Sequence, residues 1–259
     1  MPESVNLETF LSATGYIEPV PAELKKLRFI HRAVVRQAAA TGRRPEDVAV
    51  LEIGCGRGGV TLPLASLGCR VRALDIDEAD IAALKREASR RGYGNVEATV
   101  EDVFAFEDSR RYDIAIASEV FEHVLDPERL AGVVRRHIVP GGALIVTVPN
   151  GFGPWETKNA LSPYRVLRRW NWARGLAGKT PYVRGGGRDH CQRYTRRRLV
   201  DLMSAHSFEL VESGNSDFVM AVIGPLHRSA FFGNIDNRLA DLVPHWMASG
   251  WYLLFKLCD

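Results

Sequence analysis

Residues 48–59 read VAVLEIGCGRGG, and this stretch decides the fold class. It begins with a short apolar run rich in β-branched residues, turns at Gly54 and leads into a helical pattern of apolar residues up to Leu67. Such a sequence predicts a buried strand, a tight turn and a helix. Glycines in this turn let the backbone bend sharply and approach a ligand, and amides at the helix start are available as donors. A plain connection between strand and helix gives the same pattern, so other residues must decide.

The same alternation of strand and helix patterns continues along the chain. An amphipathic helix is expected over 22–40, ahead of this unit. The later strands are expected at 70–77, 96–100, 112–118 and 143–149, and the later helices at 78–91, from Asp126 and near Thr195. Strands that alternate with helices predict an α/β fold whose parallel sheet is covered by helices on both faces.

Three segments are expected in the chain. Residues 1–45 form an N-terminal helical segment, 46–225 the main domain and 226–259 an aromatic cap or tail. The main domain includes a basic, aromatic insert over 151–194. Its two closing strands are expected in the sequences SFELVESGN and DFVMAVIG.

The composition indicates an ordinary globular protein. Hydrophobic residues make up 46% and charged residues 25% of the 259 residues, and the formal net charge is +3. These values argue against disorder. The four cysteines form no CxxC pair, and we expect free thiols in a reducing compartment. The N-terminus lacks the pattern of a secretory signal, and no apolar run approaches the ~20 residues that span a bilayer. The expected location is therefore the cytoplasm.

The glycines fit two ligand-binding templates. Gly54, Gly56 and Gly58 form GxGxG, whereas Gly54, Gly56 and Gly59 form the GxGxxG of dinucleotide sites. Glu52, two residues before the first glycine, would lie unfavourably close to the pyrophosphate of a dinucleotide. A ligand that carries an ammonium and a sulfonium, and no phosphate, suits this carboxylate. An NAD-dependent oxidoreductase is therefore disfavoured, and the sequence has no recognisable hydride-transfer site.

Two further carboxylates follow expected strands. Asp75 ends the second strand and can accept hydrogen bonds from both hydroxyls of a ribose. Asp102 follows the third strand and can accept one from the amino group of adenine. Each alone reads as a surface carboxylate. Together with Glu52 they place acids at the carboxyl ends of three successive strands, the edge where open α/β sheets bind ligands.

Five segments within about 100 residues from Val50 carry a family signature: LEIGCGRGG, ALDID, VEDVF, YDIAIASEVFEHV and PGGALIVTVPN. They resemble the class I S-adenosylmethionine-dependent methyltransferases. Within that superfamily, SEVFEHV resembles the ubiquinone-biosynthesis O-methyltransferases and the small-RNA 3′-terminal methyltransferases. The resemblance implies a doubly wound, seven-stranded sheet with an antiparallel last strand, and S-adenosylmethionine as cofactor. The cofactor residues expected are Glu52, Gly54, Cys55, Gly56, Gly58, Asp75, Ile76, Asp102, Val103 and Ser118.

Glu119, Glu122 and His123 follow the fourth strand, at the edge where a methyl acceptor should sit. If ExxEH is helical, Glu119 shares a face with Glu122 or His123. His190 falls where the two families above place another histidine. These four side chains would suit Mg²⁺, Mn²⁺, Fe²⁺ or Zn²⁺, which would hold adjacent hydroxyls of the acceptor and lower the pKa of the attacked one. Without a metal, His123 or His190 is the expected general base, with Glu119 beside it, or His123 merely orients the helix.

The insert and the tail supply candidate acceptor contacts. The insert interleaves basic and aromatic residues: Tyr164, Arg165, Arg168, Arg169, Trp170, Trp172 and Arg174. Arginines can grip phosphate while the rings cover a sugar or a base, and RNA can bind in the same way, although a solvated helix also fits. The aromatic tail is expected to cap the acceptor pocket, with a dimer surface or a peripheral membrane contact as alternatives.

Three functions are compatible with these features. The leading hypothesis is an O-methyltransferase acting on a hydroxyl of a small molecule, a glycan or a lipid-linked intermediate. PNGFGPWE and PHWMASGWYLLFK resemble methyltransferases of bacterial glycan and secondary-metabolite pathways. The alternatives are a 2′-O-methyltransferase of RNA 3′ ends and a non-catalytic cofactor-binding subunit of a partner enzyme. The sequence does not decide the oligomeric state.

Overall fold

The fold is an α/β sandwich, seen in a computed structural model that describes residues 3–13, 20–154, 190–218 and 229–258. The helices are α1 (Glu3–Ser12), α2 (Pro21–Ala40), α3 (Thr61–Ser66), α4 (Glu78–Arg90), α5 (Pro127–His137), α8 (Arg196–Ala205) and α9 (Ala230–Leu242). The strands are β1 (Ala49–Ile53), β2 (Arg70–Asp75), β3 (Val96–Val100), β4 (Tyr112–Ser118), β5 (Ile138–Pro149), β6 (Phe208–Asn215) and β7 (Gly250–Leu257). Short 3₁₀ turns are η1 (Pro45–Asp47), η2 (Phe121–His123) and η5 (His245–Met247).

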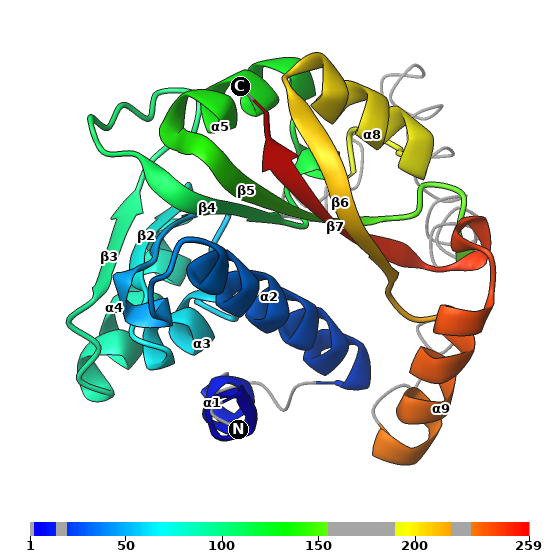
Figure 1. Cartoon of the computed structure of the whole chain (residues 1–259), viewed down its shortest axis with the longest axis horizontal. Coiled ribbons are helices and arrows are strands. Elements are labelled where there is room, and N and C mark those ends of the chain that lie inside the picture. The colour runs from blue at the N-terminus through cyan, green and yellow to red at the C-terminus, as the bar shows by residue number, and fades with distance from the viewer. Residues whose placement is uncertain (1–2, 14–19, 155–189, 219–228, 259) are drawn as a thin grey trace, which may run out of the picture.

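One seven-stranded sheet runs through the molecule in the order β3-β2-β1-β4-β5-β7-β6 (Figure 1). Strands β1 to β5 pair in parallel, and β7 is antiparallel to both of its neighbours. The direction in which strands are added reverses between β1 and β4. A doubly wound sheet opens a crevice at this switch point, at the carboxyl ends of its strands. The predicted fold class is confirmed.

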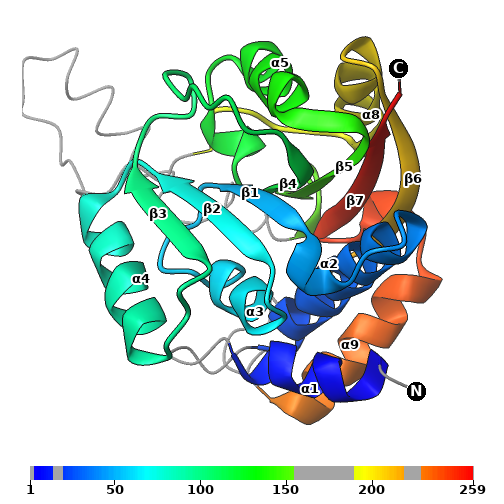
Figure 2. The same ribbon diagram turned by 60° about the vertical axis from the view of Figure 1, so that its left-hand side comes forward.

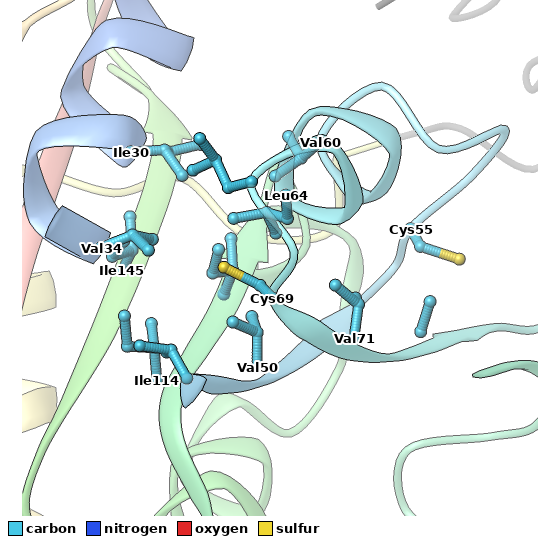
Figure 3. Packing of buried hydrophobic residues seen from close by; sticks show 14 of the residues in the cluster. Ile30, Val34, Val50, Cys55, Val60, Leu64, Cys69, Val71, Ile114 and Ile145 are labelled. Atoms are coloured by element: carbon cyan, nitrogen blue, oxygen red, sulfur yellow. The ribbon is translucent and has the colours of Figure 1, made fainter. Parts of the chain in front are cut away.

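Helices cover both faces of the sheet. Figure 2 shows α2, α3 and α4 on one face and α5 and α8 on the other. Each layer packs on its own cluster of buried apolar residues. In the first cluster Ile30 and Val34 of α2 face Ile114 and Ile145 of the central strands (Figure 3). Because the central strands are covered twice, they read as continuous apolar runs rather than alternating ones.

Local sequence signals mark where several helices begin. The Asp77 carboxylate accepts hydrogen bonds from the amides of Ala79 and Asp80 and caps α4. Asp126 accepts one from the Arg129 amide and caps α5, as predicted from Asp126 followed by proline. Such caps satisfy donors that a helix start leaves unpaired.

The division of the chain at residue 225 needs correction. Residues 250–257 form β7, which lies between β5 and β6 inside the sheet, so they are an integral strand rather than a cap or tail. Their nearly unbroken apolar run reflects burial on both faces, which leaves no period to recognise. Most of the expected strand DFVMAVIG lies outside the described residues.

Two further expectations concern the thiols and membranes. All four cysteines are free, with Cys55 and Cys69 buried and Cys191 and Cys258 exposed. Among the described helices, none has the length and apolar character needed to cross a bilayer.

Candidate active site

The glycine turn between β1 and α3 is held in a conformation that other residues rarely adopt. Gly54, Gly56 and Gly58 have φ angles of +69°, +50° and +92°, in the region that glycine tolerates without strain. A side chain at Gly54 would meet Cγ2 of Val120 at 2.6 Å. The turn therefore packs directly against the loop that follows β4, and the two expected halves of the site are neighbours.

The turn is fastened to the end of β2. The Gly56 amide donates a hydrogen bond to Oδ2 of Asp75 at 2.7 Å, and the Asp77 amide donates to Oδ1 of Asp75 at 3.0 Å. The Gly54 amide donates to the Leu74 carbonyl at 2.8 Å. The half-buried Asp75 carboxylate therefore lies beside the turn, at the carboxyl edge of the sheet.

Polar and apolar groups on the next strand ends complete this side of the crevice. Asp75 pairs with Val100 across β2 and β3, so Asp102 lies two residues beyond that pair. Asp102 is exposed, and its carboxylate accepts a hydrogen bond from the Phe104 amide at 2.9 Å. Ile76 is 76% exposed, although it directly follows a buried strand. The exposed Ile76, which lies in sequence between Asp75 and Asp102, offers an apolar surface for a flat ring.

Three expected cofactor residues lie beneath the surface. The Glu52 side chain is buried, and the Thr61 hydroxyl donates a hydrogen bond to it. Burial raises the pKa of Glu52 to about 8. The Cys55 thiol lies in the core, where burial raises its pKa (Figure 3), and the Val103 side chain packs in the opposite core cluster. These side chains therefore do not touch a ligand at the turn directly. They can affect it through their charge or by supporting the backbone of the turn.

A hydrogen-bond chain links the ends of β4 and β5. Ser118 lies opposite Thr147, and their hydroxyl oxygens are 3.0 Å apart. The fully buried Thr147 hydroxyl donates to Oε1 of Glu119 at 2.8 Å. Glu119 itself has a φ of 58°, in the left-handed region that costs a side-chain residue energy. The strand therefore ends in a constrained turn that holds an exposed carboxylate at the sheet edge.

This turn corrects the expected geometry of ExxEH. Only Phe121 to His123 form a 3₁₀ turn, and the left-handed Glu119 lies outside it. Glu119 is exposed and Glu122 is buried, and their carboxyl groups are still close enough to interact. Helical spacing is not what brings them together. The positive φ at Glu119 breaks the helical path that the spacing argument assumed.

Glu122, His123 and His190 nevertheless come together from distant parts of the chain. One potential ligand atom from each lies within 4.8 Å of the others, and no other such group of three occurs among the described residues. The His123 and His190 rings are 4.9 Å apart in an edge-to-face arrangement. Amides of Cys191 and Gln192 donate to the Glu122 carbonyl and hold this segment in place.

The Glu122 carboxyl group occupies an unusual environment. It is 1% exposed, and neither of its oxygens has a hydrogen-bond partner among the described residues. Burial, reinforced by the negative charge of Glu119, raises the pKa of Glu122 to about 9. Buried polar atoms without partners are costly and rare. The two oxygens therefore favour a ligand, a proton or a metal ion in this place.

A cavity of about 360 Å³ opens beside this cluster, at the carboxyl edge of the sheet. Glu119 and His190 line it on the side of the cluster. The remaining walls are Ala22, Glu23, Lys26, Val148, Pro149, Ser216, Asp217, Ser249, Gly250, Trp251 and Tyr252. Its size suits a small molecule.

Sequence reasoning missed several residues of this site. No site role was predicted from the sequence for Lys26, Thr147 or Asp217, because they reach the site from α2, from β5 and from the loop after β6. The insert residues with arginine, tyrosine and tryptophan fall within 155–189 and lie outside the described residues.

Comparison with known proteins identifies the family. A family model described as a methyltransferase domain matches residues 20–213, more than half of the chain. The chain belongs to the methyltransferase domain family. The match begins near α2 and ends in β6, so it includes the glycine turn, the acids of β2 and β3 and the cluster after β4.

Relatives and solved structures resemble this methyltransferase domain in part. A ubiquinone biosynthesis O-methyltransferase from Caulobacter sp. is 35% identical over 130 residues, which are 48% of this chain and 51% of that protein. The chain thus matches about half the length of its curated relatives. An S-adenosylmethionine-dependent methyltransferase from Methanosarcina mazei aligns with a TM-score of 0.53 and 22% identity over 83% of this chain and 94% of its own.

A third comparison comes from a methyltransferase structure solved with ligands. The 1,6-didemethyltoxoflavin-N1-methyltransferase from Burkholderia thailandensis contains bound S-adenosylhomocysteine. It aligns with a TM-score of 0.55 and 17% identity over 88% of this chain and 77% of its own. At such identities, these structural likenesses speak for the fold of the methyltransferase domain.

Proposed function

We propose that this methyltransferase domain binds S-adenosylmethionine and transfers its methyl group to a hydroxyl oxygen of a small molecule. The observation that carries the proposal is the arrangement of Asp75, Ile76 and Asp102 beside the glycine turn. Two carboxylates flank an exposed apolar side chain at the carboxyl ends of neighbouring strands. This arrangement suits a nucleoside that carries no phosphate.

The residues present fit the cofactor group by group. Asp75 accepts hydrogen bonds from the ribose hydroxyls, Ile76 packs on the adenine ring, and Asp102 accepts from the adenine amino group. Glu52 acts from beneath the turn, where a cationic ligand would lower its raised pKa and draw out its negative charge. The pyrophosphate of a dinucleotide would instead lie unfavourably close to the Glu52 carboxyl group.

The acceptor site is proposed for the cavity next to Glu119 and His190. When bound, S-adenosylmethionine supplies a methyl group on a positively charged sulfur, and its transfer to oxygen leaves the neutral thioether of S-adenosylhomocysteine. The acceptor hydroxyl must lose its proton as the new bond forms. Where no metal ion is bound, His123 or His190 takes that proton, because a neutral imidazole accepts protons near neutral pH.

A divalent metal ion at Glu122, His123 and His190 belongs to the proposal. The fit rests on the two buried Glu122 oxygens without partners and on the imidazoles within 4.8 Å. Nitrogen ligands favour Zn²⁺, Fe²⁺ or Mn²⁺ over Mg²⁺ at such a site. A metal ion there would lower the pKa of a hydroxyl bound next to it. Glu119 is placed outside this ligand set and acts as a neighbouring carboxylate.

The class of acceptor is proposed from chemistry and from the relatives. Curated relatives are named as O-methyltransferases of ubiquinone biosynthesis, which supports a hydroxyl acceptor. A hydroxyl on a glycan or a lipid-linked intermediate remains compatible with the open cavity. The RNA alternative rests on the insert arginines, and nothing in the described residues favours it or the non-catalytic alternative.

Two measurements test the proposed function. Calorimetry should detect binding of S-adenosylmethionine and S-adenosylhomocysteine to the purified protein. Incubation with methyl-labelled S-adenosylmethionine and fractionated extract should then place the label in organic or small-glycan fractions. Failure to bind either cofactor form would remove the proposal, and label found only in RNA would replace the acceptor class.

A further inference from the structure

The cavity at the carboxyl edge has a charge that the transfer reaction does not require. Glu23 of α2, Glu119 after β4 and Asp217 after β6 bring three carboxylates to its lining. Among the described lining residues, Lys26 is the only lysine, and there is no arginine. A hydroxyl acceptor needs a base and a methyl donor, and neither accounts for Glu23 or Asp217. Those two carboxylates lie on the wall formed by α2 and the loop after β6.

A nearby lysine does not neutralise this wall. The Lys25 ammonium forms an ion pair with Asp241 at 2.7 Å and donates to the carbonyls of Ser216 and Asn237 at 2.9 Å each. These contacts fix Lys25 to α9 and to the loop after β6. Its charge is balanced by Asp241, which leaves Lys26 as the lysine of the described lining that faces three carboxylates.

One carboxylate oxygen of Asp217 lacks a hydrogen-bond donor within the described part of the chain. Its Oδ2 atom is buried and has no hydrogen-bond partner among the described residues. The backbone around it is held firmly, because the Ser249 amide donates to the Asp217 carbonyl and the Phe218 amide donates to Asp236. A buried oxygen without a partner costs free energy. Because Oδ2 lies beneath the cavity surface, a bound donor recovers that free energy once the half-buried Asp217 side chain turns towards it.

The negative charge of these acids affects the pKa of Tyr252, a residue of the cavity wall. The buried Tyr252 hydroxyl donates to the Ala22 carbonyl at 3.1 Å. Burial raises the pKa of Tyr252 well above its usual value, and the negative charges of Asp217 and Glu119 raise it further. Three carboxylates beside Lys26 give the described lining an excess of acidic groups, next to the apolar surfaces of Val148, Pro149 and Trp251.

A second metal ion does not explain the acids. Among the described residues, the group of three potential ligands contains Glu122, His123 and His190, and neither Glu23 nor Asp217 belongs to any such group. An organic cation needs no shared coordination sphere, and its ammonium donors can reach separate carboxylates.

We propose that the acceptor of this methyltransferase carries a protonated amine, which lies against Asp217 and Glu23 while its hydroxyl faces Glu119 and His190. This inference rests on the proposed function for the identity of the cavity as the acceptor site. The apolar surfaces of Val148, Pro149 and Trp251 cover the carbon skeleton between the two polar ends. The amine fixes the orientation of the acceptor, and Asp217 acts as a specificity-determining residue.

A series of three phenols tests the charge preference. Tyramine, 4-ethylphenol and 4-hydroxyphenylacetate share one ring and one hydroxyl, and their side arms are cationic, neutral and anionic. None has adjacent hydroxyls, so none can chelate a metal ion through them. Calorimetry at low ionic strength, with and without S-adenosylhomocysteine, should show tyramine binding about tenfold more tightly than 4-ethylphenol, and 4-hydroxyphenylacetate most weakly.

Variants locate the preference. Asp217→Asn keeps the size of the side chain and should remove most of the advantage of tyramine, with Glu23→Gln removing a smaller part. Asp201→Asn is the matched control, because Asp201 lies on α8 with its side chain 69% exposed. Thermal melting and S-adenosylhomocysteine affinity should be unchanged in all three variants, which separates a lost contact from a lost fold.

Three results would overturn the inference that the acceptor carries a protonated amine. The inference fails if 4-hydroxyphenylacetate binds as well as tyramine, if Asp217→Asn keeps the full preference, or if no phenol binds to protein that binds S-adenosylhomocysteine. Loss of S-adenosylhomocysteine binding in the unmodified protein instead overturns the proposed function, and the titrations without it still report the charge preference of the cavity.

Discussion

The hydroxyl of Thr147 donates a hydrogen bond to the carboxylate of Glu119, with Oγ1 and Oε1 2.8 Å apart. Thr147 lies fully buried in β5, whereas Glu119 is exposed at the end of β4 in a left-handed conformation. The bond therefore ties the carboxylate that lines the proposed acceptor cavity to the rigid centre of the sheet. Strained residues persist only where such surroundings hold them, and they occur often at functional sites.

Thr147→Val should lower the turnover number about tenfold while leaving the affinity for S-adenosylmethionine unchanged. Valine keeps the shape of the side chain but removes the donor, so Glu119 loses its fixed direction. Steady-state kinetics with separate kcat and KM values test this expectation. Thr99→Val removes another threonine hydroxyl that donates to a carboxylate, that of Glu101, and should leave kcat unchanged.

Asp75→Ala should weaken the binding of S-adenosylhomocysteine by about 10-fold to 100-fold. The substitution removes acceptors for the ribose hydroxyls and also frees the Gly56 amide from its tether. Calorimetry gives the dissociation constant directly. Asp201→Ala, at an exposed position of α8, serves as the control, and equal affinities in the two variants would contradict the role given to Asp75.

His123→Ala should spare cofactor binding and lower the turnover number by about 100-fold or more, the usual effect of losing a general acid or base. The measurement pairs calorimetry with S-adenosylhomocysteine and single-turnover kinetics with labelled methyl donor. His245→Ala changes an exposed histidine whose backbone carbonyl accepts from Trp251, and that bond survives the substitution. Unchanged turnover in His123→Ala would refute the catalytic assignment.

Glu122→Gln and His190→Ala should each abolish stoichiometric binding of a divalent metal ion. Each variant removes one of three donors that lie within 4.8 Å, and the carboxyl group is the one that supplies negative charge. Elemental analysis after equilibration with Zn²⁺ or Mn²⁺, followed by dialysis, reports occupancy without any reference to activity. Glu107→Gln, at an exposed position, should retain the metal. If metal-free protein keeps full turnover, the proposed metal site has no role in the reaction, and the histidines remain as candidate bases.

Glu52→Gln should make the stability of the cofactor-free protein less dependent on pH. Burial raises the pKa of Glu52 to about 8 in the folded state, from about 4.5 when exposed. Between these values the folded protein holds a proton that the unfolded chain has released, so this group makes stability fall as the pH rises. Urea unfolding should therefore show that the free energy of unfolding of the variant, relative to that of the unmodified protein, increases between pH 5 and pH 8. The increase should be on the order of 2 kcal/mol.

The control for this prediction is Glu107→Gln, whose carboxylate is exposed. Its unfolding free energy should track that of the unmodified protein across the same pH range. A constant difference between Glu52→Gln and the unmodified protein at all pH values would show that Glu52 is ionised in the folded state.

Local sequence determined the first half of the fold and the cofactor side of the site. The strands 96–100 and 112–118 were predictable because stretches rich in apolar residues give way there to the acidic residues Glu101 and Glu119. Asp75 and Asp102 were predictable as neighbours because parallel strands end at one edge. These features depend on periodicity, turn chemistry and strand order, which are written in contiguous residues.

The cavity proposed as the acceptor site was decided only by tertiary structure. Strand β7 enters the sheet between β5 and β6 through pairings between distant segments, and its apolar run gives no sign of that position. Lys26, Thr147 and Asp217 meet in one site because the sheet edge collects the ends of α2, β5 and β6. The left-handed turn at Glu119 overrode the helical spacing of ExxEH, because packing against the glycine turn and the Thr147 bond hold it there. A local pattern cannot specify contacts that exist only after the strands have paired.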